Sequence, residues 1–185
     1  TRTWLVGKRI TIMGSTGSIG TSTLEVVRAL GKGYRVVGLA ANRRWRELAR
    51  QSGEFHPSAV ALADRTGVDQ LRPMLNGATE ILIGEEGLVE LARRQDADFV
   101  VAAIVGAVGL ASTIAAVEAG KDVGLANKEA LVMAGSILVP LARRSGSRLL
   151  PIDSEHSAIF QAMAAGRACE VHKVYLTASG GPFRT

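Results

Sequence analysis

Cysteines, aromatic residues and prolines are all scarce in this chain of 185 residues. Its single cysteine, Cys169, excludes an internal disulfide and suits a reducing compartment, and we expect it to act as a small buried hydrophobic residue. Aromatic residues make up 4% of the sequence, whereas hydrophobic residues make up 47% and charged residues 21%. This balance excludes a wholly disordered chain, and the wealth of small aliphatic residues is typical of parallel sheets covered by helices.

Long uncharged segments are also rare, with one exception at residues 99–117. A membrane span is one interpretation of this segment. The other is a β-branched strand, a turn marked by Gly106 and Gly109, and a buried helix, and we favour it because those glycines interrupt the run. With the second interpretation, we expect no membrane partner. The first residues show no signal-peptide or transit-peptide pattern.

The formal net charge of +5 is not gathered into a basic run. The arginines occur as scattered pairs without interleaved aromatic rings, and two of these pairs fall near expected helix ends, where cations complement the helix dipole. We therefore interpret most of them as solvated surface residues and expect no nucleic-acid partner.

Apolar or β-branched segments alternate with helical patterns through most of the chain. We expect strands at residues 9–13, 34–40, 59–62, 80–83, 99–102 and 122–125. We expect helices at residues 21–30, 44–51, 68–75, 88–94, 110–119 and 129–144. This alternation predicts an α/β fold with a doubly wound, Rossmann-like parallel sheet that has helices on both faces.

The pattern changes after Gly146. There we expect a strand at 148–152, a helix at 157–164 and a strand at 171–178. We accordingly predict a nucleotide-binding domain at residues 1–150 and the start of a second, catalytic α/β domain at 151–185. Because the sequence stops in a glycine-rich loop, we expect the remainder of this second domain to be absent.

The segment 14–20 reads Gly-Ser-Thr-Gly-Ser-Ile-Gly and lies between the first expected strand and helix. Glycines permit a tight turn and a close approach to a pyrophosphate, and the helix that follows offers its N-terminal amides. Because the spacing differs from the commoner Gly-x-Gly-x-x-Gly, an ordinary glycine-rich turn is the alternative interpretation.

The residues after the second strand indicate which dinucleotide this loop would bind. An acidic residue there usually binds the ribose 2′-hydroxyl of NAD, but this chain has Asn42, Arg43 and Arg44. An arginine can pair bidentately with a 2′-phosphate, which favours NADP. The alternative is that both arginines cap the following helix and face solvent.

Residues 102–106 and 126–129 end two neighbouring strands at the edge where open α/β sheets bind ligands. Within the second segment, Lys128 could hold a phosphate or a carbonyl-bearing substrate, and Glu129 could accept a ribose hydroxyl. Asn127 could instead be a helix N-cap.

Asp153 and Glu155 follow the next strand and are two residues apart. In extended backbone both carboxylates would point to one side, which favours a hard divalent cation such as Mg²⁺ or Mn²⁺. Water, substrate oxygens or another carboxylate would complete its shell, and His156 could be a third ligand. The alternative is a capping cluster at the start of the next helix.

Together these segments resemble the 1-deoxy-D-xylulose 5-phosphate reductoisomerases, NADPH- and metal-dependent enzymes of the non-mevalonate isoprenoid pathway. The matching segments follow the family's order and lie at 14–20, 102–106, 125–129, 151–156 and 179–184. The resemblance extends over essentially the whole chain.

The resemblance implies roles for individual residues. Those implied to contact NADPH are Thr16, Gly17, Ser18, Ile19, Asn127 and Glu129. Those implied at its 2′-phosphate, where the family has a Gly-Lys-Asn-like triplet, are Asn42, Arg43 and Arg44. Those implied to bind the metal are Asp153 and Glu155, and those implied to bind substrate are Lys128, Ser154, Glu155 and Ser179. The catalytic set is then Lys128, Asp153 and Glu155, although Asn42 departs from the usual glycine.

The resemblance also implies a reaction, an assembly and a location. The sugar phosphate substrate would be rearranged and then reduced to 2-C-methyl-D-erythritol 4-phosphate, by a homodimer in the bacterial cytoplasm or, after transit-peptide removal, in the plastid stroma. Family members are roughly twice as long as this chain. The alternatives are a non-catalytic NADPH-binding module and another Rossmann reductase, such as an aspartate-semialdehyde or homoserine dehydrogenase. Cys169 lies outside the context that the aspartate-semialdehyde enzyme requires.

Overall fold

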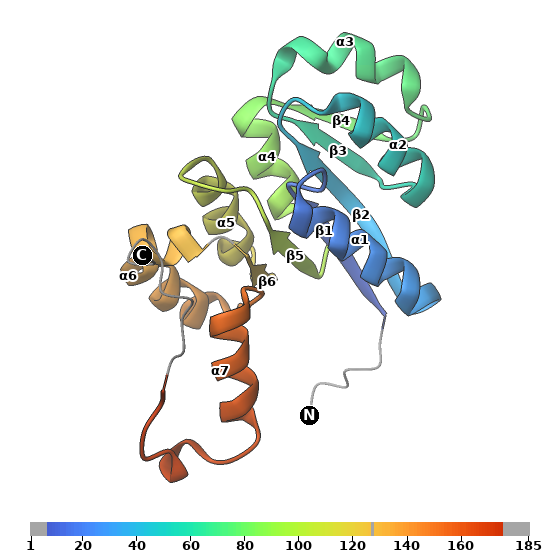
Figure 1. The fold of residues 1–185 in the computed structure, drawn as a ribbon. Coiled ribbons are helices and arrows are strands. Elements are labelled where there is room, and N and C mark those ends of the chain that lie inside the picture. Colours follow the sequence, from blue (N-terminus) through green and yellow to red (C-terminus); the bar gives the residue numbers. More distant parts are fainter. Residues whose placement is uncertain (1–6, 127, 176–185) are drawn as a thin grey trace, which may run out of the picture.

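The computed structural model describes residues 7–126 and 128–175, in which one parallel sheet is covered by helices (Figure 1). The sheet has the strand order β4-β3-β2-β1-β5-β6-β7. Its strands are β1 (Lys8–Met13), β2 (Tyr34–Ala41), β3 (Ala59–Leu62), β4 (Glu80–Ile83), β5 (Phe99–Ala102), β6 (Asp122–Leu125) and β7 (Leu149–Pro151). The predicted α/β class and doubly wound parallel sheet are confirmed.

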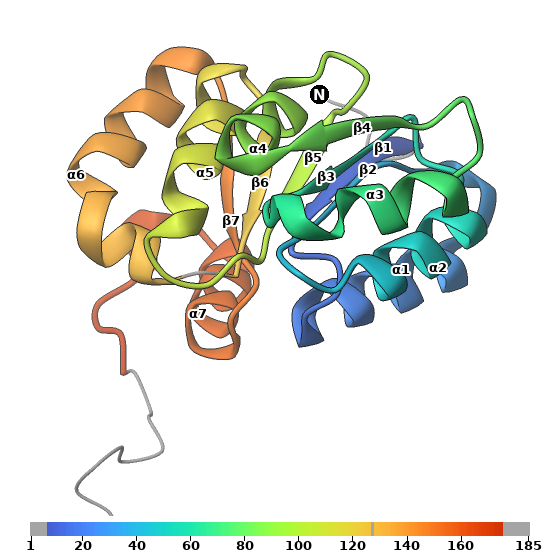
Figure 2. The same ribbon diagram turned by 90° about the horizontal axis from the view of Figure 1, so that it is seen from above.

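Helices lie on both faces of this sheet (Figure 2). Those on one face are α1 (Ser18–Leu30), α2 (Trp45–Phe55) and α3 (Val68–Leu71). Those on the opposite face are α4 (Gly84–Arg93), α5 (Val108–Glu118) and α6 (Lys128–Ser145). A further helix, α7 (Ser154–Ala164), follows β7.

The strands alternate their side chains between two apolar cores. In β1, Ile10 and Ile12 pack with α1 and α2, whereas Met13 joins the core on the other face. The same alternation in β3 sends Val60 to the first core and Ala61 to the second. Burial on both faces explains why these strands read as continuous aliphatic runs.

The strand register brings the carboxyl ends of the strands into one row. Met13 is paired with Ala40 of β2 on one side and with Ala102 of β5 on the other. The row continues from Ala102 through Leu125 to Pro151. Each loop that carries a predicted site residue therefore begins beside the next along one edge of the sheet.

The order in which strands are added to the sheet reverses between β1 and β5. Strands β2 to β4 extend the sheet on one side of β1, and β5 to β7 extend it on the other. The loops after β1 and β5 consequently diverge to opposite faces and leave a crevice between them, which is where open α/β sheets bind ligands.

The segment 99–117 forms β5, a loop and the start of α5. Among the described residues, no helix is both long enough and apolar enough to cross a membrane.

Three expectations about the end of the chain are wrong. Helix α7 begins at Ser154 rather than residue 157, because Asp153 caps it. Residues 171–175, the described part of a predicted strand, are not in a strand. Cys169 is exposed rather than buried, because the turn Ala168–Glu170 that carries it lies beyond α7, where the described residues are solvent-exposed.

One helix and one domain boundary also differ from expectation. Helix α6 is interrupted at Ala134, whose φ of −138° and ψ of 20° break the predicted long helix. Strand β7 belongs to the same sheet as the other strands and ends at Pro151, one residue past the expected domain boundary. The division at residue 150 stays a prediction.

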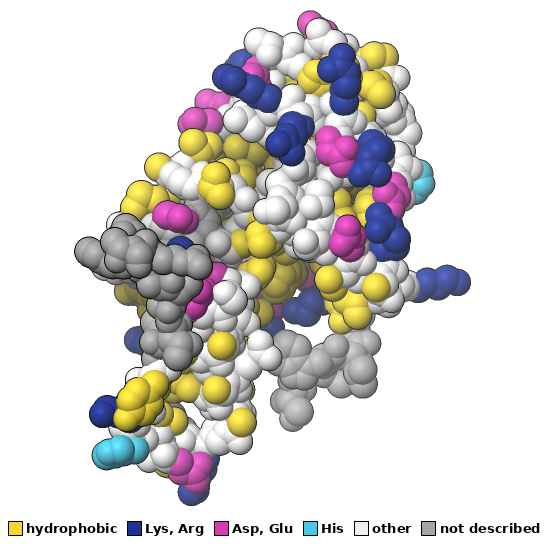
Figure 3. All heavy atoms as spheres, in the orientation of Figure 1, with side chains coloured by type: hydrophobic (Ala, Val, Ile, Leu, Met, Phe, Trp, Pro, Cys, Tyr) yellow, Lys and Arg dark blue, Asp and Glu magenta, His cyan; other side chains and the backbone are white. Residues whose placement is uncertain are grey.

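Basic and acidic side chains are interspersed on the face shown in Figure 3, over the part of the molecule that contains α1 to α3. Arg28 of α1 pairs with Glu54 of α2 at 2.5 Å, and Arg50 pairs with Glu47 within α2 at 2.6 Å. These arginines are neutralised by local partners, so they do not form a continuous basic patch.

Candidate functional site

The glycine-rich loop turns sharply between β1 and α1. Gly14 has a φ of +87°, and a Cβ there would lie 2.8 Å from the Ala103 carbonyl oxygen. A Cβ at Gly20 would overlap the Gly14 carbonyl oxygen and the Ser15 backbone. Glycine is therefore required at Gly14 by conformation and at Gly20 by packing, which brings the start of α1 against the strand ends.

The N-terminus of α1 presents backbone amides to this crevice. Gly17 is the N-cap and has no side chain to satisfy them. The first hydrogen bond of the helix runs from the Thr21 amide to the Gly17 carbonyl at 2.9 Å. The amides of residues 18–20 lie before this bond and therefore have no acceptor within the helix. Amides in this position, together with the positive end of the helix dipole, favour an anion such as a phosphate.

A cavity of about 320 Å³ lies beside this loop. Its lining residues come from the ends of β1, β2 and β5, the residue after β3, and helices α1, α4 and α5: Gly14, Thr16, Gly17, Ser18, Ile19, Ala41, Asn42, Ala63, Leu88, Ala103, Ile104, Val105 and Val108. The structure thus brings together five of the residues predicted to bind a coenzyme.

Apolar side chains surround the mouth of this cavity. Val105 is 79% exposed and Val108 is 55% exposed, although both are large aliphatic residues. Ile19 faces the same space from α1 and is 39% exposed. Such exposure beside helix-end amides suits a ligand with one anionic part and one flat apolar part.

The two arginines after β2 have different contacts. Arg43 is 82% exposed, and its Nε donates to Asp64 Oδ2 at 2.8 Å, a bond that does not use the terminal guanidinium nitrogens. Arg44 occupies the N-cap position of α2, but its Nη1 donates to the Thr16 carbonyl at 3.0 Å rather than capping the helix. Neither residue lines the cavity, so their predicted contacts with a 2′-phosphate stay predictions.

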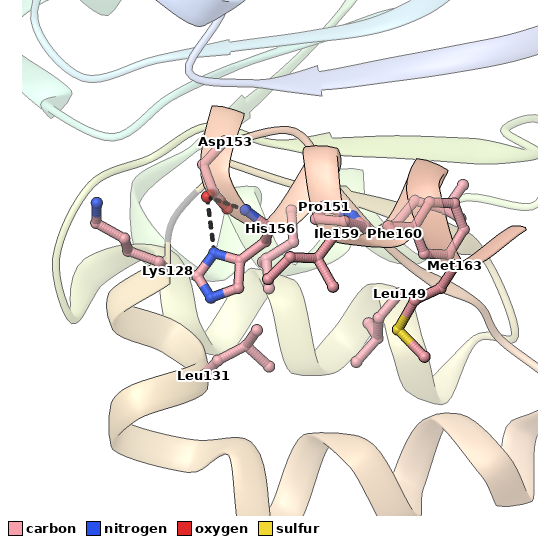
Figure 4. Close-up of a pocket in the computed structure, with 11 residues that line it drawn as sticks. Lys128, Leu131, Leu149, Pro151, Asp153, His156, Ile159, Phe160 and Met163 are labelled. Carbon is pink, nitrogen blue, oxygen red and sulfur yellow. Dashed lines mark hydrogen bonds and ion pairs between the residues drawn. The ribbon is translucent and has the colours of Figure 1, made fainter. Parts of the chain in front are cut away.

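A second pocket of about 310 Å³ opens beside the ends of β6 and β7. Figure 4 shows Lys128 and Asp153 toward one end of it and Ile159, Phe160 and Met163 of α7 along the other. Lys128 is the first residue of α6, so its ammonium group stands at the edge of the sheet beside the loop after β7. The pocket therefore combines a polar end with an apolar wall.

Asp153 caps α7, which changes the predicted relation of the two carboxylates. Its Oδ1 accepts a hydrogen bond from the His156 amide at 3.1 Å and lies 2.7 Å from His156 Nδ1. Glu155 is in the first turn of the helix, where Ser154 Oγ donates to its Oε2 at 2.9 Å. The extended backbone predicted for this pair is wrong, and the carboxylates are adjacent at a helix N-terminus instead.

Both carboxylates are stabilised in their charged forms. Partial burial would raise the pKa of Asp153, but the amide and ring of His156, with Lys128, outweigh it and hold that pKa below its usual value. The pKa of Glu155 is lowered by its own backbone amide and then by Ser154, with Lys128 also contributing. Both groups are therefore anionic at neutral pH, as ligands of a hard cation must be.

The donor set fits a Mg²⁺ ion that takes further ligands from elsewhere. Among the described residues, no group of three or more His, Cys, Asp or Glu side chains could hold a metal. The cap bonds of Asp153 use Oδ1, and Oδ2 takes part in neither of them. Mg²⁺ is commonly bound by one or two carboxylates together with water and substrate oxygens, which these two residues could supply.

The remaining predicted site residues have varied placements. Glu129 is exposed in the first turn of α6, and Ser154 is exposed at the start of α7. His156 contacts Asp153, and the fold gives it this partner rather than a position as an independent third ligand. Asn127 and Ser179 lie outside the described residues.

Two polar residues beside the loop were missed by the sequence analysis. Gln51 of α2 is 1% exposed and is hydrogen-bonded to Ser15 at both ends of its amide. Asp64, just after β3, holds Arg43. The detectable signal for Gln51 was a polar residue on the inward stripe of α2 that also contains Leu48, but its partner lies 36 residues away in sequence.

Comparison with family models identifies the same family over both parts of the chain. The model described as 1-deoxy-D-xylulose 5-phosphate reductoisomerase matches residues 10–135. The model described as the 1-deoxy-D-xylulose 5-phosphate reductoisomerase C-terminal domain matches residues 149–185.

Individual relatives agree with these models. A protein from Chloroherpeton thalassium named 1-deoxy-D-xylulose 5-phosphate reductoisomerase is 49% identical over 96% of this chain and 46% of its own length. A solved structure of the enzyme from Zymomonas mobilis in complex with NADPH has a TM-score of 0.90 and 42% identity, over 97% of this chain and 47% of that one. A solved DOX-P reductoisomerase in complex with magnesium has a TM-score of 0.86 and 43% identity, over 96% of this chain and 48% of that one.

The chain spans about half the length of the curated relatives that it matches. Within that half, these relatives align over 96% of this chain at 49% and 50% identity, which favours their family over the alternatives of an aspartate-semialdehyde or homoserine dehydrogenase. The chain belongs to the 1-deoxy-D-xylulose 5-phosphate reductoisomerase family.

Proposed function

We propose that this chain is the coenzyme-binding part, with the first metal ligands, of an enzyme that converts 1-deoxy-D-xylulose 5-phosphate to 2-C-methyl-D-erythritol 4-phosphate in the non-mevalonate isoprenoid pathway. NADPH and a divalent cation, Mg²⁺ or Mn²⁺, are its cofactors. The observation that carries this proposal is the placement of the glycine-loop cavity and the Lys128–Asp153 pocket along one edge of the sheet.

The coenzyme would lie across the carboxyl ends of β2, β1 and β5. The pyrophosphate would bind the amides of Thr16, Ser18 and Ile19 at the helix N-terminus. The 2′-phosphate would lie beside the exposed guanidinium of Arg43. The nicotinamide would then be directed toward Val105 and Val108, whose apolar side chains would shield it from water.

Strand spacing supports a shared reaction site between the two pockets. Adjacent strands are about 4.8 Å apart, so the loop after β5 lies roughly 10 Å from the loop after β7. The nicotinamide would then lie near Asp153 and the first turn of α7, which contains Glu155, with Lys128 after β6 between them. A substrate held by those groups would be within reach of the reduced ring.

The roles of the chain's own residues follow from their charge and position. Asp153 and Glu155 remain anionic and offer oxygens to the cation, and Lys128 is placed to neutralise a substrate phosphate or oxyanion. Asn127, Glu129, Ser154 and Ser179 complete the proposed contacts with coenzyme and substrate. When bound, the metal supplies Lewis-acid polarisation and NADPH supplies the hydride.

The test is NADPH oxidation in the presence of 1-deoxy-D-xylulose 5-phosphate, with and without Mn²⁺. It is run on a protein of the relatives' length that contains these 185 residues, in parallel with the 185-residue chain. We expect metal-dependent oxidation by the longer protein. Its absence there, with the protein folded and saturated with NADPH, would contradict the proposal.

A second candidate is a non-catalytic NADPH-binding module. It is favoured by the metal site, since the described residues of this chain supply only two carboxylates and no three-residue group. The same assay separates the candidates, because a non-catalytic module would bind NADPH with weak metal affinity and show negligible turnover at either length.

A further inference from the structure

We propose that Gln51 is a positioning residue that aims the backbone amide of Thr16 at the coenzyme pyrophosphate. The inference rests on the proposed binding of NADPH at the glycine-rich loop, and it adds a role for a buried side chain that never touches the ligand. The role follows from two hydrogen bonds between Gln51 and Ser15.

The two bonds form a closed pair inside the protein. Ser15 Oγ donates to Gln51 Oε1 at 2.7 Å, and Gln51 Nε2 donates to the Ser15 carbonyl at 2.9 Å. Ser15 is 0% exposed and Gln51 is 1% exposed, so water does not compete for these groups. A buried glutamine with both ends satisfied fixes its partner's position strongly, because breaking either bond leaves an unpaired polar atom.

The bond to the carbonyl also sets the direction of the next amide. The described chain has no cis peptide bond, and in a trans peptide the carbonyl of one residue points opposite to the N–H of the next. Gln51 draws the Ser15 carbonyl toward α2, so the Thr16 N–H points away from α2. Among the described residues, that N–H has no hydrogen-bond partner.

The opposite direction is where the cavity lies. Helix α2 packs on one face of the sheet, whereas Leu88 and Val108 of the cavity wall belong to helices on the other face. Thr16 lines this cavity although it is only 8% exposed. An unpaired amide at the edge of a buried loop and directed into a cavity is a suitable donor to a phosphate oxygen.

Arg44 secures the following peptide. Its Nη1 donates to the Thr16 carbonyl at 3.0 Å, and the Gly17 amide donates to the Gly14 carbonyl at 3.1 Å. The peptide groups on both sides of Thr16 are thus held in place, one by Gln51 and one by Arg44. Arg44 is the N-cap residue of α2 and Gln51 lies within this helix, so α2 acts as the support of the loop.

The experiment measures NADPH binding to the 185-residue chain by calorimetry. In Gln51→Met the side chain keeps its approximate size but loses both bonds, and we expect NADPH affinity to fall at least about tenfold, the size of one lost charge-assisted hydrogen bond. In Ser15→Ala the bond from Gln51 Nε2 to the carbonyl remains, so the affinity should stay within about threefold of wild type. Ser52→Ala, another buried position of α2, is the matched control and should bind as wild type does.

A second ligand separates positioning from general damage. Adenosine 2′-monophosphate has the 2′-phosphate but no pyrophosphate, so Gln51→Met should bind it as wild type does. Equal losses for both ligands, or unchanged NADPH affinity in Gln51→Met, would overturn the inference. Failure of the wild-type chain to bind NADPH would instead refute the proposed function.

Nuclear magnetic resonance of the wild-type chain tests the same point without any variant that could fail to fold. NADPH should shift the Thr16 amide proton downfield, and adenosine 2′-monophosphate should not. An unmoved Thr16 amide in the NADPH-saturated chain would overturn the inference.

Discussion

At the scale of single residues, the charge at Arg43 is expected to decide which dinucleotide binds. Its guanidinium is exposed and held by Asp64 through Nε, which orients the group without using its terminal nitrogens. We predict that Arg43→Ala weakens NADPH binding by about 10- to 100-fold, as expected for a lost charge-assisted contact with a phosphate, while NADH binding changes little.

Arg50→Ala is the matched control for Arg43→Ala, because Arg50 is an exposed arginine of the adjoining helix and pairs with Glu47. Calorimetric titration with both coenzymes should leave its selectivity unchanged. Equal losses of NADPH and NADH affinity in Arg43→Ala would remove Arg43 from the 2′-phosphate site.

Asp153 has two separable roles, as a helix cap and as a proposed metal ligand. Asparagine is also a good N-cap, so Asp153→Asn should leave the free energy of unfolding nearly unchanged, whereas Asp153→Ala should lower it by about 1 kcal/mol. Both variants lose the carboxylate, and we predict that both abolish metal-dependent activity in a protein of the relatives' length.

Urea unfolding and Mn²⁺-dependent NADPH oxidation measure the two roles of Asp153 independently. Retained activity in Asp153→Asn would show that the carboxylate serves only as a cap and would remove it from the metal site.

At the scale of secondary structure, the contact between the glycine-rich loop and α1 depends on Gly20. Alanine usually stabilises a helix relative to glycine by about 0.5–1 kcal/mol, but a Cβ at Gly20 would overlap backbone atoms of Gly14 and Ser15. We predict that Gly20→Ala destabilises the fold and abolishes NADPH binding, because backbone cannot move aside as a flexible side chain can.

Gly53→Ala provides the contrast, since Gly53 lies in α2 with no atom within 4 Å of an added Cβ. It should raise the free energy of unfolding by about 0.5–1 kcal/mol and leave NADPH binding intact. If Gly20→Ala also stabilised the protein, the close packing of this loop against α1 would be refuted.

The elements were largely predictable because their signals are local. Each strand of the sheet is a short aliphatic run, and each following helix has its own apolar stripe, so six strand–helix units could be read without knowledge of the partners. Helix α7 begins three residues earlier than predicted, because Asp153 caps it and Glu155 belongs to its first turn, which agrees with the alternative of a capping cluster.

Long-range contacts were not predictable in the same way. The pairing of Gln51 with Ser15 and of Asp64 with Arg43 depends on helices and strands that only the folded sheet brings together. The exposure of Cys169 likewise depends on what packs after α7 rather than on the nature of the residue. Residue type and spacing indicated the coenzyme loop, but they could not indicate what supports it.

At the scale of the whole molecule, the two edges of the sheet have different functions. The carboxyl edge carries the cavities, whereas ion pairs join strands at the amino edge. Asp122 at the start of β6 accepts from Arg148 Nε at 2.9 Å and from Lys8 Nζ at 3.2 Å, and its side chain is 9% exposed. These bonds link β1, β6 and the residue before β7 across the sheet.

This network gives stability a defined dependence on pH. The Arg148 side chain, opposed by partial burial and aided by Lys8, holds the pKa of Asp122 below its usual value. The unfolded chain therefore binds this proton more readily, near pH 4, than the folded protein does. The stabilisation is fully present above about pH 4 and is lost as the pH falls through the lowered folded-state pKa.

Asp122→Asn should lower the free energy of unfolding by about 1–2 kcal/mol at pH 7 and flatten its decline in acid. Urea unfolding between pH 3 and pH 7 measures both effects. Glu25→Gln, an exposed position of α1, is the control and should alter neither. If the free energy of unfolding of Asp122→Asn declined in acid as steeply as that of the wild type, the network would not determine the stability in acid.

The most direct test of the account is the titration of the 185-residue chain with NADPH and with NADH under identical salt and pH. The account predicts one NADPH bound per chain, with an affinity at least about tenfold higher than that for NADH, because one additional phosphate is bound by a guanidinium. Absence of NADPH binding, or equal affinity for the two coenzymes, would contradict it.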